Sequence, residues 1–494
     1  MKSFDDKAPL YGEKIVFAKQ MAVFEKEQIS KDPSLAERFM DNAALGLFKI
    51  LEQKVLDSRQ VDRVVLLIGK GNNGADAFAL GAYLVQVGFL VEAFALFKET
   101  NPLSEKKAQV FQSHGGRVHL LESIKDFVLS DNCLVIDGLL GTGFTGKTSG
   151  ILSEVIEAVN HHNCFVFSID IPSGVDGNTG MVGGSAIYAD MTAYLGVLKI
   201  GHLFEKGLEH CGLLHYVDFG LNCTSLSSNC YLFNSNCLHY NLPKRSRLCN
   251  KYDVGQVIAV CGNTHMKGAA ELCCAAAYRA GCGLVRHFYL GDGAVSMKEV
   301  ITLKMTPQAF EQELYRTKAI VIGPGLGRDQ EAKDIVTYVT QIPNIPIVID
   351  GDALFLLEKP PKYAILTPHK GELLRLLGIV KETKDADILK AAQSYADKYQ
   401  VIIIYKGVPT VILSPKKDMI VIVSGNPGMS SGGTGDVLAG IVTSFLAQGS
   451  EAIDAATLGV TVHGKAADFA AMHLSERYML ASDIIHYLSE VFLE

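Results

Sequence analysis

The chain has 494 residues, of which 48% are hydrophobic and 20% charged, and its formal net charge is −7. At roughly 150 residues per domain, this length predicts two or three domains of globular composition. A net negative charge offers no long-range attraction for nucleic acids or acidic membranes. Lys and Arg gather only in a short run at 242–252, which is no basic stripe. We therefore expect no nucleic acid and no membrane among the partners.

The opening stretch, MKSFDDKAPLYGEK, lacks the apolar core of a secretion signal. No uninterrupted apolar run reaches the roughly 18 residues of a membrane-spanning helix. The eleven cysteines show no Cys-x-x-Cys spacing, which favours reduced, buried thiols over a disulfide framework or a metal site. These features lead us to expect a cytoplasmic protein.

The first part of the chain reads as a doubly wound α/β domain over residues 1–221. Up to about residue 55, apolar residues recur at helical spacing. The runs at 64–68, 133–137 and 164–170 are apolar without alternation, which is typical of buried parallel strands. Amphipathic stretches separate them, so helices are expected to cover both faces of one sheet.

Residues 222–245 are rich in Ser, Asn and Cys and weakly periodic, which predicts a linker or a short crossing strand. A second alternating series fills residues 246–494, with apolar runs such as GQVIAVCG, IPIVIDGDAL and VIIIYKG. Each run ends in Gly, Pro, Asp or a charged residue. Because ligands of open α/β sheets bind beyond the carboxyl ends of the strands, these ends are expected to line one site.

The stretch at 69–74, GKGNNG, follows an apolar strand and has the G-x-G-x-x-G spacing of a dinucleotide loop. Glu92 lies near the distance at which a ribose-binding acid is expected, but it sits inside the run FLVEAFALF rather than at a strand end. Asn72, Asn73 and Asp76 crowd the place where a bound pyrophosphate would meet bare backbone. The loop alone leaves it open whether NAD would be a cofactor or something else.

Two later strand ends add polar groups. Asp137 precedes a loop rich in Gly and Thr at 141–147, and Asp170 precedes Ser173. Such a loop, ending in Lys, suits phosphates. Asn73, Asp137 and Ser173 offer hard oxygen ligands for a monovalent or divalent cation.

The strongest signal is GNPGMSSGGTGDVLAGIVTSFLAQG at 425–449. Its glycines lead into a helix whose N-terminus exposes N–H groups to an anion. Asp436, in the first turn, can take a proton from a hydroxyl that attacks phosphorus, as phosphoryl transfer requires. The plain alternative is an aspartate that caps the helix. Further strand ends with His369 and with Lys406–Thr410 favour the catalytic interpretation.

The first half resembles the epimerase domain of the bifunctional NAD(P)H-hydrate repair enzymes. The resemblance covers roughly residues 15–220 and rests on FMDNAALG, GKGNNGADAFALGAYL, VIDGLLGTGFTGK and SIDIPSGVDGNTG, in that order. It implies that the first loop binds the damaged nucleotide rather than an intact cofactor, with Asp170 as the acid–base group at the hydrated carbon. It also implies a potassium ion at Asn73, Asp137 and Ser173. The implied contacts to the hydrate are Asn72, Asn73, Gly74, Ala75, Asp76, Gly141, Thr142, Gly143, Phe144, Thr145, Gly146, Lys147 and Asp170.

The first loop departs from the family pattern N-N-G-G-D-G, because Ala75 and Ala77 replace glycines. A methyl group at a position that needs positive φ would cost about 1 kcal/mol or more. In helical backbone the cost would vanish, so the conformation of Ala75 decides whether the departure bears on epimerase activity.

The second half resembles the ribokinase-like dehydratase domain of the same enzymes over roughly residues 246–492. The ordered matches include KGAAELCCAAAYRAGCGLV, IGPGLG, VIDGDAL, TPHKGE, YKGVPTVI and NPGMSSGGTGDVLAGI. Directly after His369 the family more commonly has proline, whereas this chain has Lys370. The resemblance implies dehydration of NADHX and NADPHX with ADP or ATP, and with magnesium, through phosphorylation of the hydroxyl and loss of phosphate. Asp436 would be the base. The implied contacts are Ala269, Gly325, His369 and Asp436 for the hydrate, and Lys406, Gly407, Val408, Pro409, Thr410, Asn426, Gly432, Gly433, Thr434 and Gly435 for the nucleotide.

We therefore predict a bifunctional, ADP-dependent NAD(P)H-hydrate repair enzyme that assembles as a homo-oligomer. The alternatives are a ribokinase-type small-molecule kinase with an accessory nucleotide-binding domain, and a first domain that only binds or senses a nucleotide. An NAD-dependent dehydrogenase is disfavoured, because no acid–base site pairs with the first loop. The sequence does not decide between ADP and ATP, nor whether the two sites exchange substrate directly.

Overall fold

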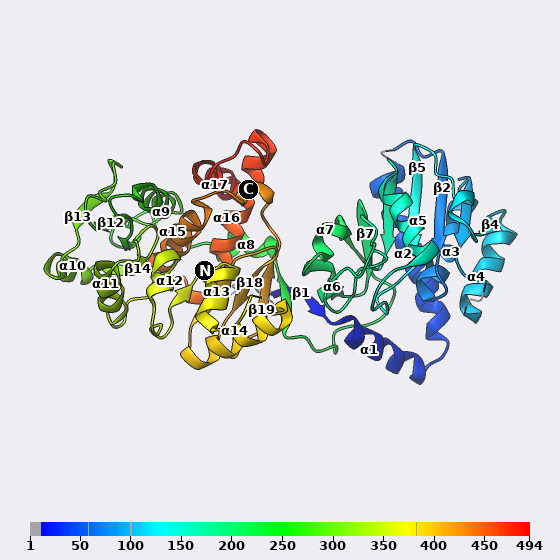
Figure 1. Cartoon of the computed structure of the whole chain (residues 1–494), viewed down its shortest axis with the longest axis horizontal. Coiled ribbons are helices and arrows are strands. Elements are labelled where there is room, and N and C mark those ends of the chain that lie inside the picture. Colours follow the sequence, from blue (N-terminus) through cyan, green and yellow to red (C-terminus); the bar gives the residue numbers. More distant parts are fainter. Residues whose placement is uncertain (1–10, 58, 99–100, 382) are drawn as a thin grey trace. The chain divides into compact units, whose positions relative to one another are not determined.

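A computed structural model of the chain describes residues 11–57, 59–98, 101–381 and 383–494. The chain forms two compact units (Figure 1): Lys14–Ser228, and Asn229–Glu494 with the described N-terminal residues up to Glu13. Strand β1 (Tyr11–Val16) passes from one unit to the other. The segment 222–245, expected as a linker or short strand, is divided between the units, and its second part contains β10 (Cys230–Phe233).

The first unit is built on a parallel sheet. Its strands are β2 (Arg63–Ile68), β3 (Val91–Ala95), β4 (Arg117–Leu120), β5 (Cys133–Gly138), β6 (Phe165–Ile169), β7 (Met191–Leu195) and β9 (Leu213–Val217), and the short β8 (Leu198–Lys199) pairs with β1. The sheet order is β4-β3-β2-β5-β6-β7-β9. Because the chain proceeds outward from β2 in one direction and from β5 in the other, the topological switch point lies between these strands. The predicted Rossmann-like doubly wound arrangement is confirmed.

Apolar cores on both faces of this sheet explain its continuous apolar runs. Val64, Leu66 and Ile68 of β2 belong to one buried cluster, whereas Val65 and Leu67 belong to another. Successive side chains of a strand point to opposite faces, so a strand covered on both sides needs apolar residues throughout. The helices are α1 (Ala18–Lys31), α2 (Leu35–Leu51), the π-helical η1 (Glu52–Leu56), α3 (Asn72–Gln86), α4 (Pro102–Ser113), the 3-10 helix η2 (Ile124–Asp126), α5 (Gly150–Asn160), α6 (Ile200–Leu203) and α7 (Gly207–Cys211).

The second unit contains a larger, mixed sheet. Its further strands are β11 (Gln256–Val260), β12 (Leu284–Tyr289), β13 (Ile301–Lys304), β14 (Thr317–Ile322), β15 (Ile347–Ile349), β16 (Ile365–Leu366), β17 (Ile402–Tyr405), β18 (Thr410–Leu413) and β19 (Met419–Ile422). The order is β13-β12-β11-β14-β15-β16-β17-β18-β19-β10, with β1 next. Strand β18 runs antiparallel to both of its neighbours, β17 and β19. The switch point lies between β11 and β14.

Helices pack against this sheet (Figure 1). Helices α9 (Lys267–Arg279), α15 (Thr434–Ala447), α16 (Ala452–Leu474) and α17 (Ala481–Leu493) contact one another and share an apolar core with the strands. Gly440 of α15 packs directly on α9, because a Cβ there would lie 2.3 Å from the Cys273 carbonyl oxygen. The remaining helices of this unit are the 3-10 helix η3 (Ser235–Cys237), α8 (Leu238–Asn241), α10 (Pro307–Leu314), α11 (Gln330–Thr340), α12 (Gly351–Leu356), α13 (Lys370–Leu377), α14 (Asp385–Tyr399) and the 3-10 helix η4 (Pro427–Met429).

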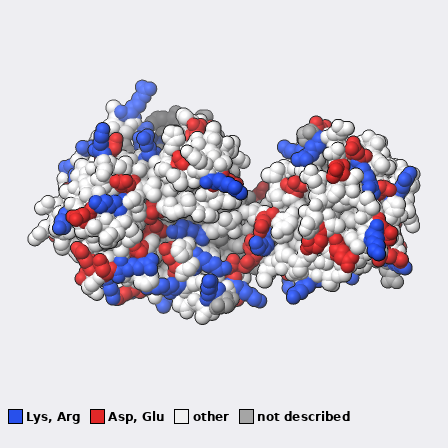
Figure 2. Space-filling view, turned by 45° about the horizontal axis from the view of Figure 1, so that its top comes forward, with Lys and Arg blue, Asp and Glu red and all other residues white. Residues whose placement is uncertain are grey.

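The predicted fold class, a Rossmann-like domain followed by a ribokinase-like α/β domain, is confirmed. All eleven cysteines are free thiols in the structure. Within the described residues, no helix is long and apolar enough to cross a membrane. On the face seen in Figure 2, basic and acidic side chains are intermingled over each unit.

Candidate active sites in the two units

In the first unit, the candidate residues follow the carboxyl ends of β2, β5 and β6, which are neighbours at the switch point. After β2 the loop leads into α3, whose first residue is Asn72. A Cβ on Gly74 would lie 2.3 Å from the Gly69 carbonyl oxygen. Glycine is therefore needed at position 74 for close packing of α3 on the loop. Gly69–Gly74 thus form a tight strand-to-helix turn, as the spacing predicted.

Ala75 and Ala77 lie within α3 and are fully buried. The Ala75 N–H donates to the Gly71 carbonyl at 3.3 Å, which is the helical hydrogen bond. Neither alanine has positive φ. The steric cost that a left-handed conformation would impose does not arise, so this departure from the family pattern is compatible with the fold.

Asn73, Asp137 and Ser173 meet at the carboxyl end of β5 and are all buried. Ser173 donates its hydroxyl to Asp137 Oδ1 at 2.5 Å and its N–H to Oδ2 at 2.8 Å. Ser168 donates its hydroxyl to the same Oδ2 at 2.9 Å. Asn73 donates its amide to the Leu140 carbonyl at 2.9 Å. Burial raises the pKa of Asp137, and the serine donors oppose this rise.

Asp170 follows β6 and is held in an unusual backbone conformation, with φ of 61°. Its Oδ1 accepts hydrogen bonds from Lys199 Nζ at 2.6 Å and from the Leu195 N–H at 3.0 Å. Burial acts to raise the pKa of Asp170, but the cation of Lys199 outweighs it and the pKa is lowered. Non-glycine residues in left-handed backbone concentrate at functional sites, where surrounding contacts hold them.

His202 and Lys199 build the support beneath Asp170. His202 Nδ1 accepts the Lys199 N–H at 3.1 Å, so its Nε2 carries the proton and donates to the Asp170 carbonyl at 2.7 Å. Burial, reinforced by the nearby Lys199 cation, lowers the pKa of His202 to about 4. The imidazole is therefore neutral at physiological pH, and the only cation in this support is the fully buried lysine.

A pocket of about 120 Å³, partly open to solvent, lies over these residues. It brings together four predicted contacts, Asn72, Asp76, Thr142 and Asp170, with side chains of α1 and α2. Glu25 of α1 also lines it. Burial raises the pKa of Asp76 well above its usual value, and the charges of Asp170 and Glu25 raise it further.

The loop at 141–147 extends from this pocket to the surface. Gly141 and Thr142 are partly buried, and Gly141 approaches the Asn73 side chain. Gly143 and the segment 145–147 are exposed. The structure thus brings only the first part of this loop to the pocket, and the assignment of its last residues to the hydrate stays a prediction.

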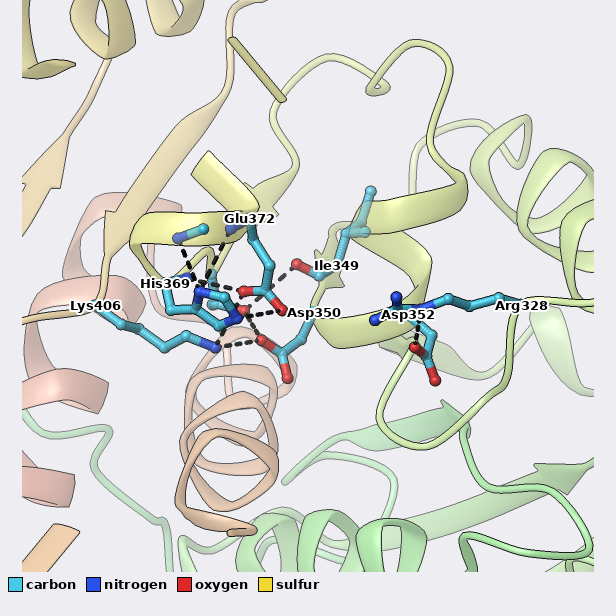
Figure 3. A network of polar contacts seen from close by, with 9 residues as sticks. Arg328, Ile349, Asp350, Asp352, His369, Glu372 and Lys406 are labelled. Atoms are coloured by element: carbon cyan, nitrogen blue, oxygen red, sulfur yellow. Dashed lines mark hydrogen bonds and ion pairs between the residues drawn. The ribbon is translucent and has the colours of Figure 1, made fainter. Parts of the chain in front are cut away.

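In the second unit, charged residues converge at the carboxyl ends of β15, β16 and β17 (Figure 3). Lys406, after β17, lies 2.9 Å from Asp350 Oδ1 and 3.9 Å from Glu372. Thr367 donates its hydroxyl to Asp350 at 2.5 Å. Burial acts to lower the pKa of Lys406, but Asp350 and Glu372 outweigh it and the pKa is raised. Lys406 is therefore a firmly charged cation inside an acidic cluster.

The N-terminus of α15 enters the same cluster. A Cβ on Gly435 would lie 3.2 Å from Lys406 Nζ and 4.0 Å from Asp350 Oδ2, so glycine leaves this space open. Asp436 follows in the first turn. Burial raises the pKa of Asp436 to about 7, with Asp350 adding to the rise and Lys406 opposing it. A carboxylate with a pKa near neutrality is suited to general-base catalysis.

His369 is an exposed cap of helix α13. Its Nδ1 accepts the N–H groups of Gly371 at 3.0 Å and Glu372 at 3.3 Å (Figure 3). The His369 N–H donates in turn to Glu372 Oε2 at 2.8 Å. The ring is thus oriented by the helix terminus and by Glu372, whose Oε1 lies 3.4 Å from Nε2, while 60% of the His369 side chain is exposed. Its assignment to the hydrate stays a prediction.

The other predicted contacts fall into three places. Gly325, with φ of 59°, abuts Ala269, since a Cβ on Gly325 would lie 2.8 Å from the Ala269 methyl group. The turn at 407–408 between β17 and β18 is exposed, whereas Pro409 is buried. Gly432–Gly435 form the entry to α15 beside Lys406.

The side chain of Asn426 makes two hydrogen bonds, one within its own loop and one to helix α16. Its amide nitrogen donates to Asp468 Oδ1 at 3.0 Å, and its amide oxygen accepts the Gly428 N–H at 3.0 Å. Asp468, on α16, also accepts the Gly425 N–H at 3.0 Å. Asp468 therefore holds the loop that precedes α15 and fixes the orientation of the Asn426 amide, and the assignment of Asn426 to the nucleotide stays a prediction.

Sequence reasoning missed several residues of these sites. Asp350 stands at the strand end of the quoted run VIDGDAL, a position that could have marked it. Lys199 is a lone cation in the run YLGVLKIGHL, which is the signal of a buried ion pair. Glu25 and Asp468 lie on helices far along the chain from the motifs they serve, and no local pattern points to them.

Glu92 is excluded as a ribose-binding acid. It is the second residue of β3, at the amino end of the strand, and it bonds Arg63 at 2.6 Å and His119 at 3.2 Å. The sites lie at the opposite, carboxyl edge of the sheet. Glu92 therefore does not supply the ribose contact that an NAD-cofactor site would have.

Comparison with known proteins agrees with both halves. Residues 36–201 match the family model described as YjeF-related protein N-terminus, and residues 257–490 match the model described as NAD(P)H-hydrate dehydratase. The bifunctional NAD(P)H-hydrate repair enzyme Nnr of Moorella thermoacetica is 31% identical over 484 residues, covering 92% of this chain and 91% of that protein. The enzyme of the same name from Escherichia coli K12 is 32% identical over 465 residues, covering 92% and 88%. A crystal structure of the ADP/ATP-dependent NAD(P)H-hydrate dehydratase from Bacillus subtilis, with ATP and Mg²⁺, is 28% identical, covers 53% and 96%, and has a TM-score of 0.49. This chain belongs to the family of bifunctional NAD(P)H-hydrate repair enzymes.

Proposed function

We propose that the chain repairs hydrated NADH and NADPH in two reactions. The first unit interconverts the R and S epimers of NADHX and NADPHX. The second unit dehydrates the S epimer and converts ADP to AMP and phosphate. The observation that carries the proposal is the position of Asp436, which lies at the glycine-lined mouth of α15 beside Lys406 and Asp350.

Dehydration uses Asp436 as the base. Asp436 takes the proton of the hydrate hydroxyl while that oxygen attacks the terminal phosphorus of the nucleotide. The N–H groups at the start of α15 and the Lys406 cation stabilise the negative charge on the transferred group. The phosphorylated oxygen then leaves as phosphate, and loss of a ring proton restores the double bond. Asp350 and Glu372 hold Lys406 in place for this role.

The nucleotide would lie over Gly432–Gly435 and the turn that begins at Lys406. We propose ADP as the co-substrate, with ATP as the competing choice. When bound, magnesium would neutralise phosphate charge. No group of three or more His, Cys, Asp or Glu side chains in the described part of the chain could hold a metal ion. Magnesium would therefore be carried chiefly by the phosphates and water, as is common for this ion.

Potassium is the proposed ion of the first unit, at Asn73, Asp137 and Ser173. These residues supply carboxylate, hydroxyl and amide oxygens, and the Asn73 amide is turned so that its nitrogen bonds Leu140. Asp137 is fully buried, and the hydrogen bonds it accepts from Ser168 and Ser173 come from neutral groups. A cation beside it would balance this buried charge, so the residues fit a potassium ion that orders the loop after β5. A cytoplasmic location and a homo-oligomeric assembly stay predictions.

The test uses the two epimers separately. The S epimer of NADHX is mixed with the protein and either ADP or ATP, and NADH is followed by the absorbance of its reduced ring. We expect NADH and AMP from the reaction with ADP. A higher kcat/KM with ATP would reverse only the choice of nucleotide. Failure with both nucleotides would refute the proposal, and accumulation of a phosphorylated hydrate would indicate a ribokinase-type kinase instead.

A further inference from the structure

The pocket of the first unit contains two buried carboxyl groups whose surroundings differ. Asp170 is paired: its Oδ1 accepts the Lys199 ammonium and the Leu195 N–H. Asp76 is only 6% exposed, and among the described residues it has no hydrogen-bond partner for its carboxyl group. Both residues line the same pocket. An unpaired buried carboxyl group beside a paired one is the arrangement that separates an acid from a base.

The position of Asp76 on α3 removes one source of help for its ionised form. The helix N-terminus stabilises negative charge mainly within the first turn, and Asp76 begins the second turn of a helix that starts at Asn72. The charged groups that face Asp76 are Glu25 from α1, Asp170 after β6 and Lys107 from α4. Lys107 is itself bonded to Asp41 of α2. Asp76 therefore lacks a dedicated cation, and burial favours its protonated form.

The epimerisation needs a proton donor as well as an acceptor. Hydration of the enamine in dihydronicotinamide places the hydroxyl on the carbon bonded to the ring nitrogen. That hydroxyl leaves as water when it is protonated, and the nitrogen lone pair forms a C=N bond as the C–O bond breaks. Inversion then requires water to add to the opposite face and give up one proton. A site with only an ionised aspartate would supply the second step and not the first.

We infer that Asp76 donates the proton to the departing hydroxyl while Asp170, held by Lys199, accepts the proton of the returning water. This inference rests on the proposed epimerase function and assigns the chemistry of its pocket. One O–H bond breaks at Asp76 and one forms at Asp170, so protons balance. Return of the proton from Asp170 to Asp76 through pocket water restores the starting state.

Glu25 is the competing donor, because it lines the same pocket and its pKa is raised by burial and by Asp170. It is more exposed than Asp76, and it lies on α1 at the pocket wall rather than beside the loop that precedes α3. Asp76 adjoins Asn72 and Asn73, the residues expected to hold the nucleotide. The carboxyl group nearer to that loop is the one placed to reach the ring.

The experiment compares Asp76→Asn with Glu25→Gln in the full chain, using the R epimer of NADHX and chromatographic separation of the epimers. We expect Asp76→Asn to reduce kcat for epimerisation by about a hundredfold or more, as loss of a general acid does, with KM changed less than about threefold. We expect Glu25→Gln to lose less than about tenfold. The urea unfolding transition of the first unit serves as the folding control for Asp76→Asn, and unchanged dehydration of the S epimer shows that the other unit is intact.

A pH profile separates an acid from a merely structural residue. In the unmodified protein the epimerase rate should fall at high pH, where Asp76 loses its proton, and Asp76→Asn should abolish this alkaline limb. The inference is overturned if Asp76→Asn keeps kcat within about fivefold, if its loss lies in KM, or if Glu25→Gln shows the larger loss. An unmodified protein without epimerase activity would refute the proposed function and this inference together.

Discussion

Replacement of Asp436 by Asn should stabilise the second unit while it abolishes dehydration. The folded protein raises the pKa of Asp436 from 3.8 to about 7 through burial and the neighbouring Asp350. The unfolded chain therefore releases this proton more readily than the folded chain does. The free energy of unfolding therefore falls as pH rises from about 4. This loss of stability, called the deficit below, is complete above about pH 7. The neutral amide of Asp436→Asn escapes the deficit.

The magnitude follows from linkage. At about 1.36 kcal/mol per pH unit, the deficit approaches roughly 4 kcal/mol at pH 8 and is about 1.7 kcal/mol at pH 5. The gain in unfolding free energy of Asp436→Asn over the unmodified protein should therefore grow by about 2 to 3 kcal/mol between these pH values. Other titrating groups are common to both proteins, so the comparison isolates Asp436.

The assay is urea unfolding of both proteins at the two pH values, with the transition of the second unit followed separately because a two-unit chain need not unfold in one step. A gain that is equal at both pH values, or a loss at pH 8, would refute the reasoning. The kinetic counterpart is that kcat/KM for dehydration rises about tenfold per pH unit below about pH 7 and levels above it, because the base must be ionised.

Three further predictions concern other parts of the sites. Lys406→Met leaves Asp350 buried without its cation, so the unfolding free energy of the second unit should fall by about 3 kcal/mol or more. Adding Asp350→Asn should restore most of it, and a double variant no more stable than Lys406→Met would contradict this. Asp468→Ala frees the loop before α15, so KM for the nucleotide should rise about tenfold at little-changed kcat in steady-state assays; a fall in kcat alone would count against a positioning role. Ala75→Gly should lower the unfolding free energy of the first unit by about 1 kcal/mol without increasing epimerase activity, because the residue is helical. A gain in activity would show that the family glycine is needed.

The sequence predicted the fold well, because the apolar runs of both sheets carry a direct signal. The runs at 64–68 and 133–137 became β2 and β5 with little change in bounds. The glycine-rich entry to α15 was equally readable, since backbone N–H groups and an acid in the first turn are local features. The conformation of Ala75 was left open by sequence and required the helix start at Asn72 to be known.

The charge states of the site residues could not be read from sequence. Asp170 follows β6 and Asp76 lies in the helix that follows β2, yet Lys199 pairs with Asp170 and burial isolates Asp76. Lys406 was expected at the nucleotide, and its place inside the cluster with Asp350 depends on strands that are far apart along the chain. Such pairings arise from tertiary contact, which local patterns do not encode.

The most direct test of the account follows the R epimer of NADHX, with ADP, through the complete reaction. We predict that the unmodified protein converts it fully to NADH, and that Asp436→Asn forms the S epimer but no NADH. Asp170→Asn should show the opposite defect, leaving the R epimer while it still dehydrates the S epimer. A mixture of the two variants should restore NADH formation, because each supplies the site the other lacks. Loss of both reactions in Asp436→Asn, or no NADH from the mixture, would contradict the claim that one chain carries two separate, consecutive active sites.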